Sequence, residues 1–149
     1  MKTASEKERI LIVDDSPETL EMLQRNLRAE GYDVLTAPGV AEAIRILDDT
    51  PADLVITDYK MPRTSGMDLI RHVRENLKST EVMMITGYAT VEGAVEAIKT
   101  GAEEYLTKPF TDDELFGAVR RALGKLRLRL AGQDLSTLKK HARYGLLGD

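Results

Sequence analysis

Three carboxylates, a hydroxyl and an amine are the groups in this sequence whose types and spacing could do chemistry. They belong to Asp14, Asp15, Asp58, Thr86 and Lys108. Each follows a short apolar run, and the intervals of 44 residues from Asp14 to Asp58, 28 to Thr86 and 22 to Lys108 are each about the length of whole βα units. Three carboxylates in one place would repel one another, and a hard divalent cation such as Mg²⁺ would offset that repulsion.

The chemistry that suits this set is phosphoryl transfer to a carboxylate. A carboxylate can act as a nucleophile toward phosphorus. Lys108 offers a positive charge for a phosphoryl oxygen, and Thr86 offers a hydroxyl donor, so positioning and charge neutralisation would carry the reaction. Taken singly, the Asp14-Asp15 pair reads as a turn or helix cap and Asp58 as a loop cap. The interpretation therefore depends on the whole set.

The elements that must position these residues are short apolar runs typical of buried strands, which alternate with segments of helical periodicity. Apolar runs at 9–13, 32–37, 53–57, 81–85 and 104–107 predict five buried parallel strands. Helical periodicity separates them, with Ser16-Pro17 and a capping box at Thr111–Glu114 as helix starts and Gly31 and Gly101 as helix ends. Repeated βα alternation predicts a doubly wound α/β sheet. Sites in such sheets form beyond the C-terminal ends of the strands, where the five groups are expected to meet.

These residues resemble the motifs of the receiver domain of bacterial response regulators over about residues 8–123. The matching motifs are Asp14-Asp15, Asp58-x-x-Met61-Pro62, Thr86-Gly87 and Lys108-Pro109-Phe110. The resemblance implies a flavodoxin-like (βα)5 fold with strand order 2-1-3-4-5. It also implies that a sensor histidine kinase phosphorylates Asp58. Mg²⁺ would then be held by Asp15, Asp58 and the Lys60 backbone carbonyl, and Asp14 would assist through metal-bound water.

The resemblance also implies a switch. Thr86 would move toward the phosphoryl group, and Tyr105 would swing inward behind it; the alternative is that Tyr105 is a plain half-buried strand aromatic. A cis Lys108–Pro109 bond is expected, since it turns the lysine toward the site. Gly93 lies inside the fourth predicted helix and is either a tolerated surface glycine or a sign of a helix kept marginal for switching.

The stretch MITGYATVEGAVEAIKTGAEEYLTKPF resembles, more narrowly, receivers of the nitrogen-regulator type. Those precede an AAA+ ATPase domain that acts on an RNA polymerase holoenzyme. Residues 144–149 resemble the segment that opens such ATPase domains, so we interpret the chain as a piece of a longer protein. Residues 124–149 would be a basic linker, helical where it begins, that leads to the absent output domain.

A homodimer is expected through this linker helix. Apolar residues step by four, three and four along a heptad seam, which consists of Val119, Leu123, Leu126 and Leu130. Two alternatives stay open. In one, Val119 and Leu123 pack on the sheet while the rest of the segment frays. In the other, the strict alternation of basic residues and leucine over residues 125–130 gives this segment a period of two, which competes with the helical period.

Other functions fit the sequence less well. A stand-alone phosphorelay receiver is one alternative. A haloacid-dehalogenase-like phosphatase is a second, less favoured one, because such enzymes need two aspartates separated by one residue after the first strand, whereas Asp14 and Asp15 are directly adjacent. We therefore expect a regulatory domain and not an enzyme.

No Walker A motif, nucleic-acid-binding pattern, membrane-spanning run or cysteine occurs in the 149 residues, so a cytoplasmic protein without direct nucleic-acid or membrane contact is expected. Net charge is −4, with +4 after residue 123 and −8 before it, which suggests two parts with different roles.

Overall fold

Five strands and five helices alternate along the chain, as the sequence pattern predicts. The computed structural model describes residues 7–61, 63–87 and 90–143. The strands are β1 (Arg9–Val13), β2 (Asp33–Ala37), β3 (Leu54–Asp58), β4 (Glu81–Thr86) and β5 (Glu104–Thr107), and the helices are α1 (Pro17–Ala29), α2 (Val40–Asp49), α3 (Gly66–Asn76), α4 (Val91–Thr100) and α5 (Asp112–Arg143). All strands are parallel, in the order β2-β1-β3-β4-β5, which confirms the predicted topology.

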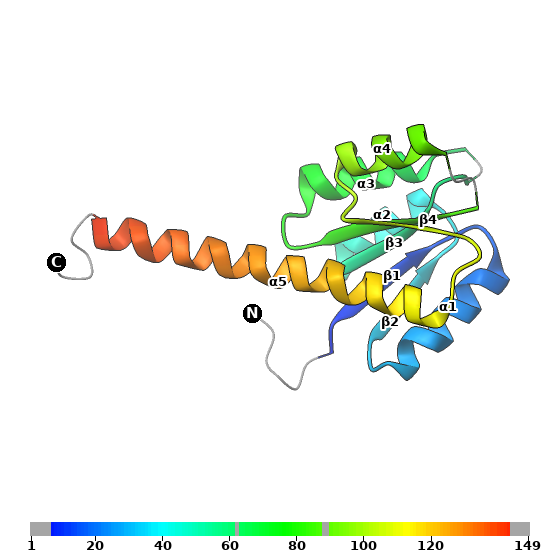
Figure 1. The fold of residues 1–149 in the computed structure, drawn as a ribbon, viewed down its shortest axis with the longest axis horizontal. Coiled ribbons are helices and arrows are strands. Elements are labelled where there is room, and N and C mark those ends of the chain that lie inside the picture. Colours follow the sequence, from blue (N-terminus) through cyan, green and yellow to red (C-terminus); the bar gives the residue numbers. More distant parts are fainter. Residues whose placement is uncertain (1–6, 62, 88–89, 144–149) are drawn as a thin grey trace.

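The sheet is covered on both faces, and the core is accordingly in two layers (Figure 1). Successive residues of β1 point to opposite faces: Leu11 packs in the layer beneath α2, α3 and α4, whereas Ile10 and Ile12 pack beneath α1 and α5. Burial on both faces explains why β1, β3 and β4 are nearly continuous apolar runs in the sequence.

Local signals fix the helix ends where they were expected. The Ser16 side chain accepts a hydrogen bond from the Thr19 amide at the start of α1. At the start of α5, the Glu114 amide donates to Thr111 Oγ1 over 3.1 Å and the Thr111 amide donates to Glu114 Oε1 over 2.8 Å, a complete capping box. Gly31 and Gly101 follow α1 and α4 with φ of +97° and +131°, a region that favours glycine.

Helix α5 continues far past the body of the domain, as a single helix to Arg143 (Figure 1). The period-two alternative for residues 125–130 is therefore wrong. The predicted seam is not a free dimer surface either, because its first three residues are buried in the core and the fourth packs against it: Val119, Leu123, Leu126 and Leu130. The alternative in which Val119 and Leu123 pack on the sheet is correct in that respect. Its second part, that the rest of the segment frays, is wrong, because Leu126 is buried as well and Leu130 packs against the core.

Four strand boundaries differ by one residue from the prediction. Tyr32 precedes β2, Asp53 precedes β3, and β3 and β4 each end one residue later, so that Asp58 and Thr86 are the last residues of their strands instead of the first residues after them. None of the described helices is both long enough and apolar enough to cross a membrane.

Candidate functional site

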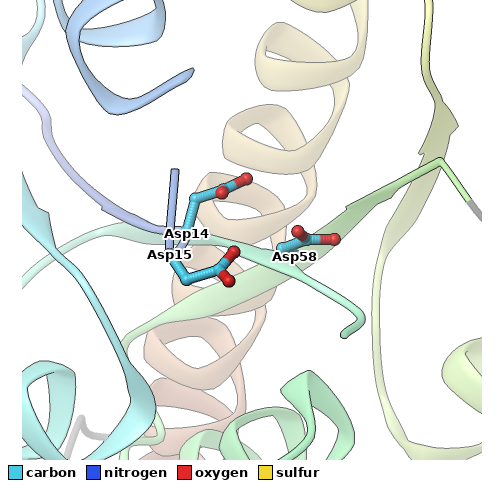
Figure 2. A group of neighbouring side chains, drawn as sticks. All are labelled: Asp14, Asp15 and Asp58. Atoms are coloured by element: carbon cyan, nitrogen blue, oxygen red, sulfur yellow. The ribbon is translucent and has the colours of Figure 1, made fainter. Parts of the chain in front are cut away.

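Three carboxylates meet at the C-terminal ends of two neighbouring strands (Figure 2). Asp14 and Asp15 follow β1 directly, and Asp58 is the last residue of β3. One oxygen from each side chain lies within 4.8 Å of the others, and in the part of the chain that the structure describes this is the one such group of potential metal ligands. Asp14 is buried, Asp58 half-buried and Asp15 exposed. The predicted convergence of the three acids is thus confirmed.

Lys108 brings the positive charge that the sequence predicts. Its ammonium nitrogen lies 3.2 Å from Asp14 Oδ2 and 3.6 Å from Asp58 Oδ2, so that it bridges the two less exposed acids. The Lys108–Pro109 peptide bond is cis, as expected. Asp14 is held from its other side, because Asp14 Oδ1 accepts a 2.8 Å hydrogen bond from the Ser16 amide.

The electrostatics of the site disfavour the ionised form of Asp58. Burial raises the pKa of the Asp58 carboxyl, and the neighbouring Asp14 charge raises it further. Lys108 and a hydrogen bond from the Tyr59 backbone oppose this shift without cancelling it, while Asp15 adds to it. A divalent cation among the three carboxylates would supply the missing positive charge, and aspartate oxygens are the ligands that Mg²⁺ prefers. The residues present therefore fit a magnesium site.

The backbone of Asp58 is held by a contact that the sequence does not reveal. A Cβ built on Gly66 would overlap the Asp58 carbonyl oxygen and come within 3.0 Å of Thr57 Oγ1, so that only glycine permits α3 to begin this close to the end of β3. Thr57 Oγ1 also donates a 3.0 Å hydrogen bond to the Asp58 carbonyl. Close packing, and not a positive φ, is what requires glycine at this position.

The two predicted switch residues lie on the strands beyond β3. Thr86 ends β4, next to β3, and is fully buried. Tyr105, on β5, packs with Tyr59 against the core layer beneath α2, α3 and α4. Its hydroxyl is buried and lies 3.7 Å from the position that a Cβ on Gly93 would occupy. Burial, followed by the proximity of Tyr59, raises the pKa of the Tyr105 hydroxyl, and the nearby Thr90 backbone opposes the shift.

Two further positions of the predicted motifs follow Asp58 in the chain. Lys60 forms a short antiparallel bridge with Ser65, which ties the loop after β3 to the start of α3; its role as a backbone ligand stays a prediction. Pro62, part of the motif that follows Asp58, lies outside the described residues.

An acidic cluster with a lysine, placed at the C-terminal edge of a 2-1-3-4-5 sheet, defines a class of phospho-accepting signalling domains. Comparison with known proteins agrees: residues 10–120 match the response regulator receiver domain, and the chain belongs to this family. It is therefore a regulatory domain of two-component systems and not an enzyme.

Known relatives place it more narrowly. The chain is 38% identical to the response regulator protein PilR of Pseudomonas aeruginosa over 117 residues, which are 78% of this chain and 26% of that protein. It is 37% identical to the transcriptional regulatory protein GlrR of Escherichia coli over 114 residues, 76% of this chain and 26% of GlrR. It thus spans about a quarter of the length of these relatives.

A solved structure, the beryllofluoride-activated NtrC4 receiver domain dimer, superposes with a TM-score of 0.75 at 33% identity. The match covers 79% of this chain and 98% of that one. The resemblance to receivers of the nitrogen-regulator type is thereby confirmed.

Proposed function

We propose that Asp58 accepts a phosphoryl group from the phosphohistidine of a sensor histidine kinase. A carboxylate oxygen of Asp58 attacks phosphorus, the phosphorus–nitrogen bond breaks, and the imidazole leaves with its electron pair. Lys108, 3.6 Å from Asp58 Oδ2, is placed to pair with a phosphoryl oxygen. The observation that carries the proposal is the meeting of three carboxylates and this lysine at one sheet edge.

Magnesium fits this proposal as the resident cation. Asp15 and Asp58 would hold it together with the Lys60 backbone carbonyl, and Asp14 would contribute through a bound water. When bound, it neutralises charge on the phosphoryl oxygens. Asp14 is also oriented by the Ser16 amide and paired with Lys108 at 3.2 Å, so that its carboxylate keeps one direction while a phosphoryl group arrives.

The test uses acetyl phosphate as donor, in the presence of Mg²⁺. Wild-type protein should incorporate one labelled phosphoryl group, and Asp58→Asn should abolish the incorporation. Asp49→Asn, which removes an exposed aspartate at the end of α2, is the matched control and should label normally. Labelling of Asp58→Asn at the wild-type level would refute the assignment, and sustained hydrolysis of phosphomonoesters would favour the phosphatase alternative.

The phosphoryl group is proposed to act through Thr86 and Tyr105. Thr86 would donate its hydroxyl to a phosphoryl oxygen, and Tyr105 would move in response and alter the surface of α4 and β5. A ligand shifts such an equilibrium only by binding one state better than the other. Thr86→Val should therefore label at Asp58 but fail to show the chemical-shift changes that beryllofluoride causes in α4 of the wild type. Unchanged responses in the variant would exclude this route.

We further propose that the phosphorylated domain controls an AAA+ ATPase domain that acts on an RNA polymerase holoenzyme, with residues 124–149 as the connection. The similarity to PilR and GlrR supports this output; a stand-alone phosphorelay receiver is the alternative. A homodimer is proposed because the similar NtrC4 receiver is described as a dimer when activated by beryllofluoride.

Sedimentation with and without beryllofluoride and Mg²⁺ tests the dimer. We expect association on activation, and an unchanged sedimentation coefficient would contradict it. Since the seam through Leu130 is buried against the body, any contact between copies along α5 must use its other faces or the residues that follow Leu130.

A further inference from the structure

A buried carboxylate lies at the end of the sheet opposite the acidic cluster. It belongs to Glu81, the first residue of β4, which is 1% exposed. Two arginines from different helices share one of its oxygens, Oε1: Arg74 from α3, through Nη1, and Arg129 from α5, through Nη1 at 2.9 Å. A single buried oxygen therefore joins β4, α3 and α5.

Both guanidinium groups also donate to backbone carbonyls. Arg74 Nε donates to the Gly101 carbonyl over 2.6 Å, and Arg129 Nη2 donates to the Lys78 carbonyl over 2.7 Å. A charge buried in this way gives little net stability, because desolvation offsets the attraction, but its hydrogen bonds accept only a narrow range of geometries. Such a cluster serves to fix one arrangement of the elements more than to strengthen the fold.

The cluster is placed where α5 leaves the body. Arg121 and Lys125, eight and four residues before Arg129 on the same side of the helix, pair with Glu104 and Glu103 over 3.0 and 3.2 Å. Those basic side chains are about half exposed or more, so that their pairs contribute little energy. The pair of Arg129 is the buried one, and Leu130 beside it packs against the core layer, the last residue to do so among the side chains of α5 that the structure describes.

We propose that Arg74, Glu81 and Arg129 form a clamp that fixes the direction in which α5 emerges from the domain. The same helix begins at Asp112, four residues after Lys108, so that it runs from the acidic site to the clamp as one rigid element. The consequence for signalling rests on the proposed function: if the residues after α5 lead to an output domain, the clamp sets the geometry in which that domain is presented.

The absence of cysteine from the chain permits a direct test by pairs of spin labels. Labels at Glu75→Cys on α3 and Gly132→Cys on α5, both exposed positions, report the angle of the helix to the body. The parent should give one narrow distance distribution, and R129M and E81Q should each lose it to a broad one. Arg120 is exposed on α5 and forms no ion pair with the residues that the structure describes, so R120M removes the same charge as a control and should match the parent.

Narrow distributions like the parent's in both R129M and E81Q would overturn the clamp, whatever happens to the melting temperature. If either variant fails to fold, R129K decides: it keeps the charge but loses the two-branched guanidinium, and it should also broaden the distribution. A narrow distribution in R129K would then count against the proposal. Labelling of Asp58 by acetyl phosphate should be unchanged in R129M, so that a failure to label would bear on the proposed function and not on the clamp.

Discussion

Asp58 carries a charge that its folded environment disfavours. Burial and the Asp14 carboxylate raise its pKa above the ordinary value of 3.8, more than Lys108 lowers it. An acid with a raised pKa binds its proton more tightly in the folded state, so that ionisation weakens the fold. The stability tied to this group is fully present below the unfolded pKa and is lost as the pH rises through the folded pKa.

We therefore predict that Asp58→Asn raises the melting temperature at pH 7 in EDTA, because the amide removes one of three neighbouring negative charges. The difference from wild type should shrink as the pH is lowered toward 3.8, where the wild-type carboxyl becomes protonated as well. Thermal melts across this range, with Asp49→Asn as control, measure the effect. Equal melting temperatures of wild type and Asp58→Asn at pH 7 would show that the charge of Asp58 does not destabilise the fold.

Gly66 gives a second prediction for a single residue. A methyl group at this position would overlap the Asp58 carbonyl oxygen, which is backbone and can move only with the strand. Gly66→Ala should lower the free energy of unfolding by about 1–3 kcal/mol, the usual cost of overpacking, and slow the labelling of Asp58. Gly124→Ala, inside α5 with open space around the new Cβ, should instead stabilise by roughly 1 kcal/mol. Urea unfolding of the two variants tests the contrast; destabilisation by both would point to a general effect of alanine.

Among the elements, α4 is weakly attached to the core. Only Gly93 and Ala97 of α4 are buried, whereas α1 buries Leu23 and Leu27. Three apolar side chains on the outer face of α4 are exposed: Val91, Val95 and Ile98. The surface-glycine interpretation of Gly93 is wrong, since the residue is buried against Tyr105 and Tyr59.

A helix with so few buried contacts should open locally more often than the rest of the fold. We predict that amides in the middle of α4 exchange with solvent faster than those in the middle of α1 under native conditions. Hydrogen exchange followed by NMR or mass spectrometry measures this. Exchange as slow in α4 as in α1 would show that the helix is not marginal.

Sequence patterns predict elements well when the signal is local. Ser16-Pro17 and Thr111–Glu114 mark helix starts through hydrogen bonds within one turn, and the structure has both. The seam of α5 shows the limit, because a helix that packs on a sheet and one that pairs with a second helix have nearly the same apolar period. The sequence places Leu126 on an apolar stripe, but only the tertiary structure shows that the sheet covers it.

The same limit applies to the candidate site. Asp14, Asp58 and Lys108 could be predicted to meet because parallel strands end at one edge of a sheet. The contact of Gly66 with the Asp58 carbonyl and the sharing of Glu81 between two helices depend on how elements pack, and no spacing in the chain encodes either. Glutamate at the start of a strand is ordinary in sequence, although here it is fully buried.

At the scale of the whole molecule, the start of the basic segment after residue 123 is paired with the acidic body. The three basic residues of that segment whose side chains the structure describes all pair with glutamates of the body: Lys125 with Glu103, Arg127 with Glu8, and Arg129 with Glu81. The opposite charges thus hold the first turns of the predicted linker against the sheet. The difference in charge that the sequence shows is in part an internal interface.

The acidic cluster should couple the stability of the whole fold to Mg²⁺. A ligand that binds only the folded state adds about 2.7 kcal/mol of stability at a hundredfold excess over its dissociation constant. We predict a gain of this order for wild type at saturating Mg²⁺. A much smaller gain is expected for Asp15→Asn, which removes the most exposed carboxylate of the cluster and leaves the Lys108 pairs intact. Melting curves over a Mg²⁺ titration, with Asp49→Asn as control, distinguish the variants. An equal gain in Asp15→Asn would place the cation elsewhere.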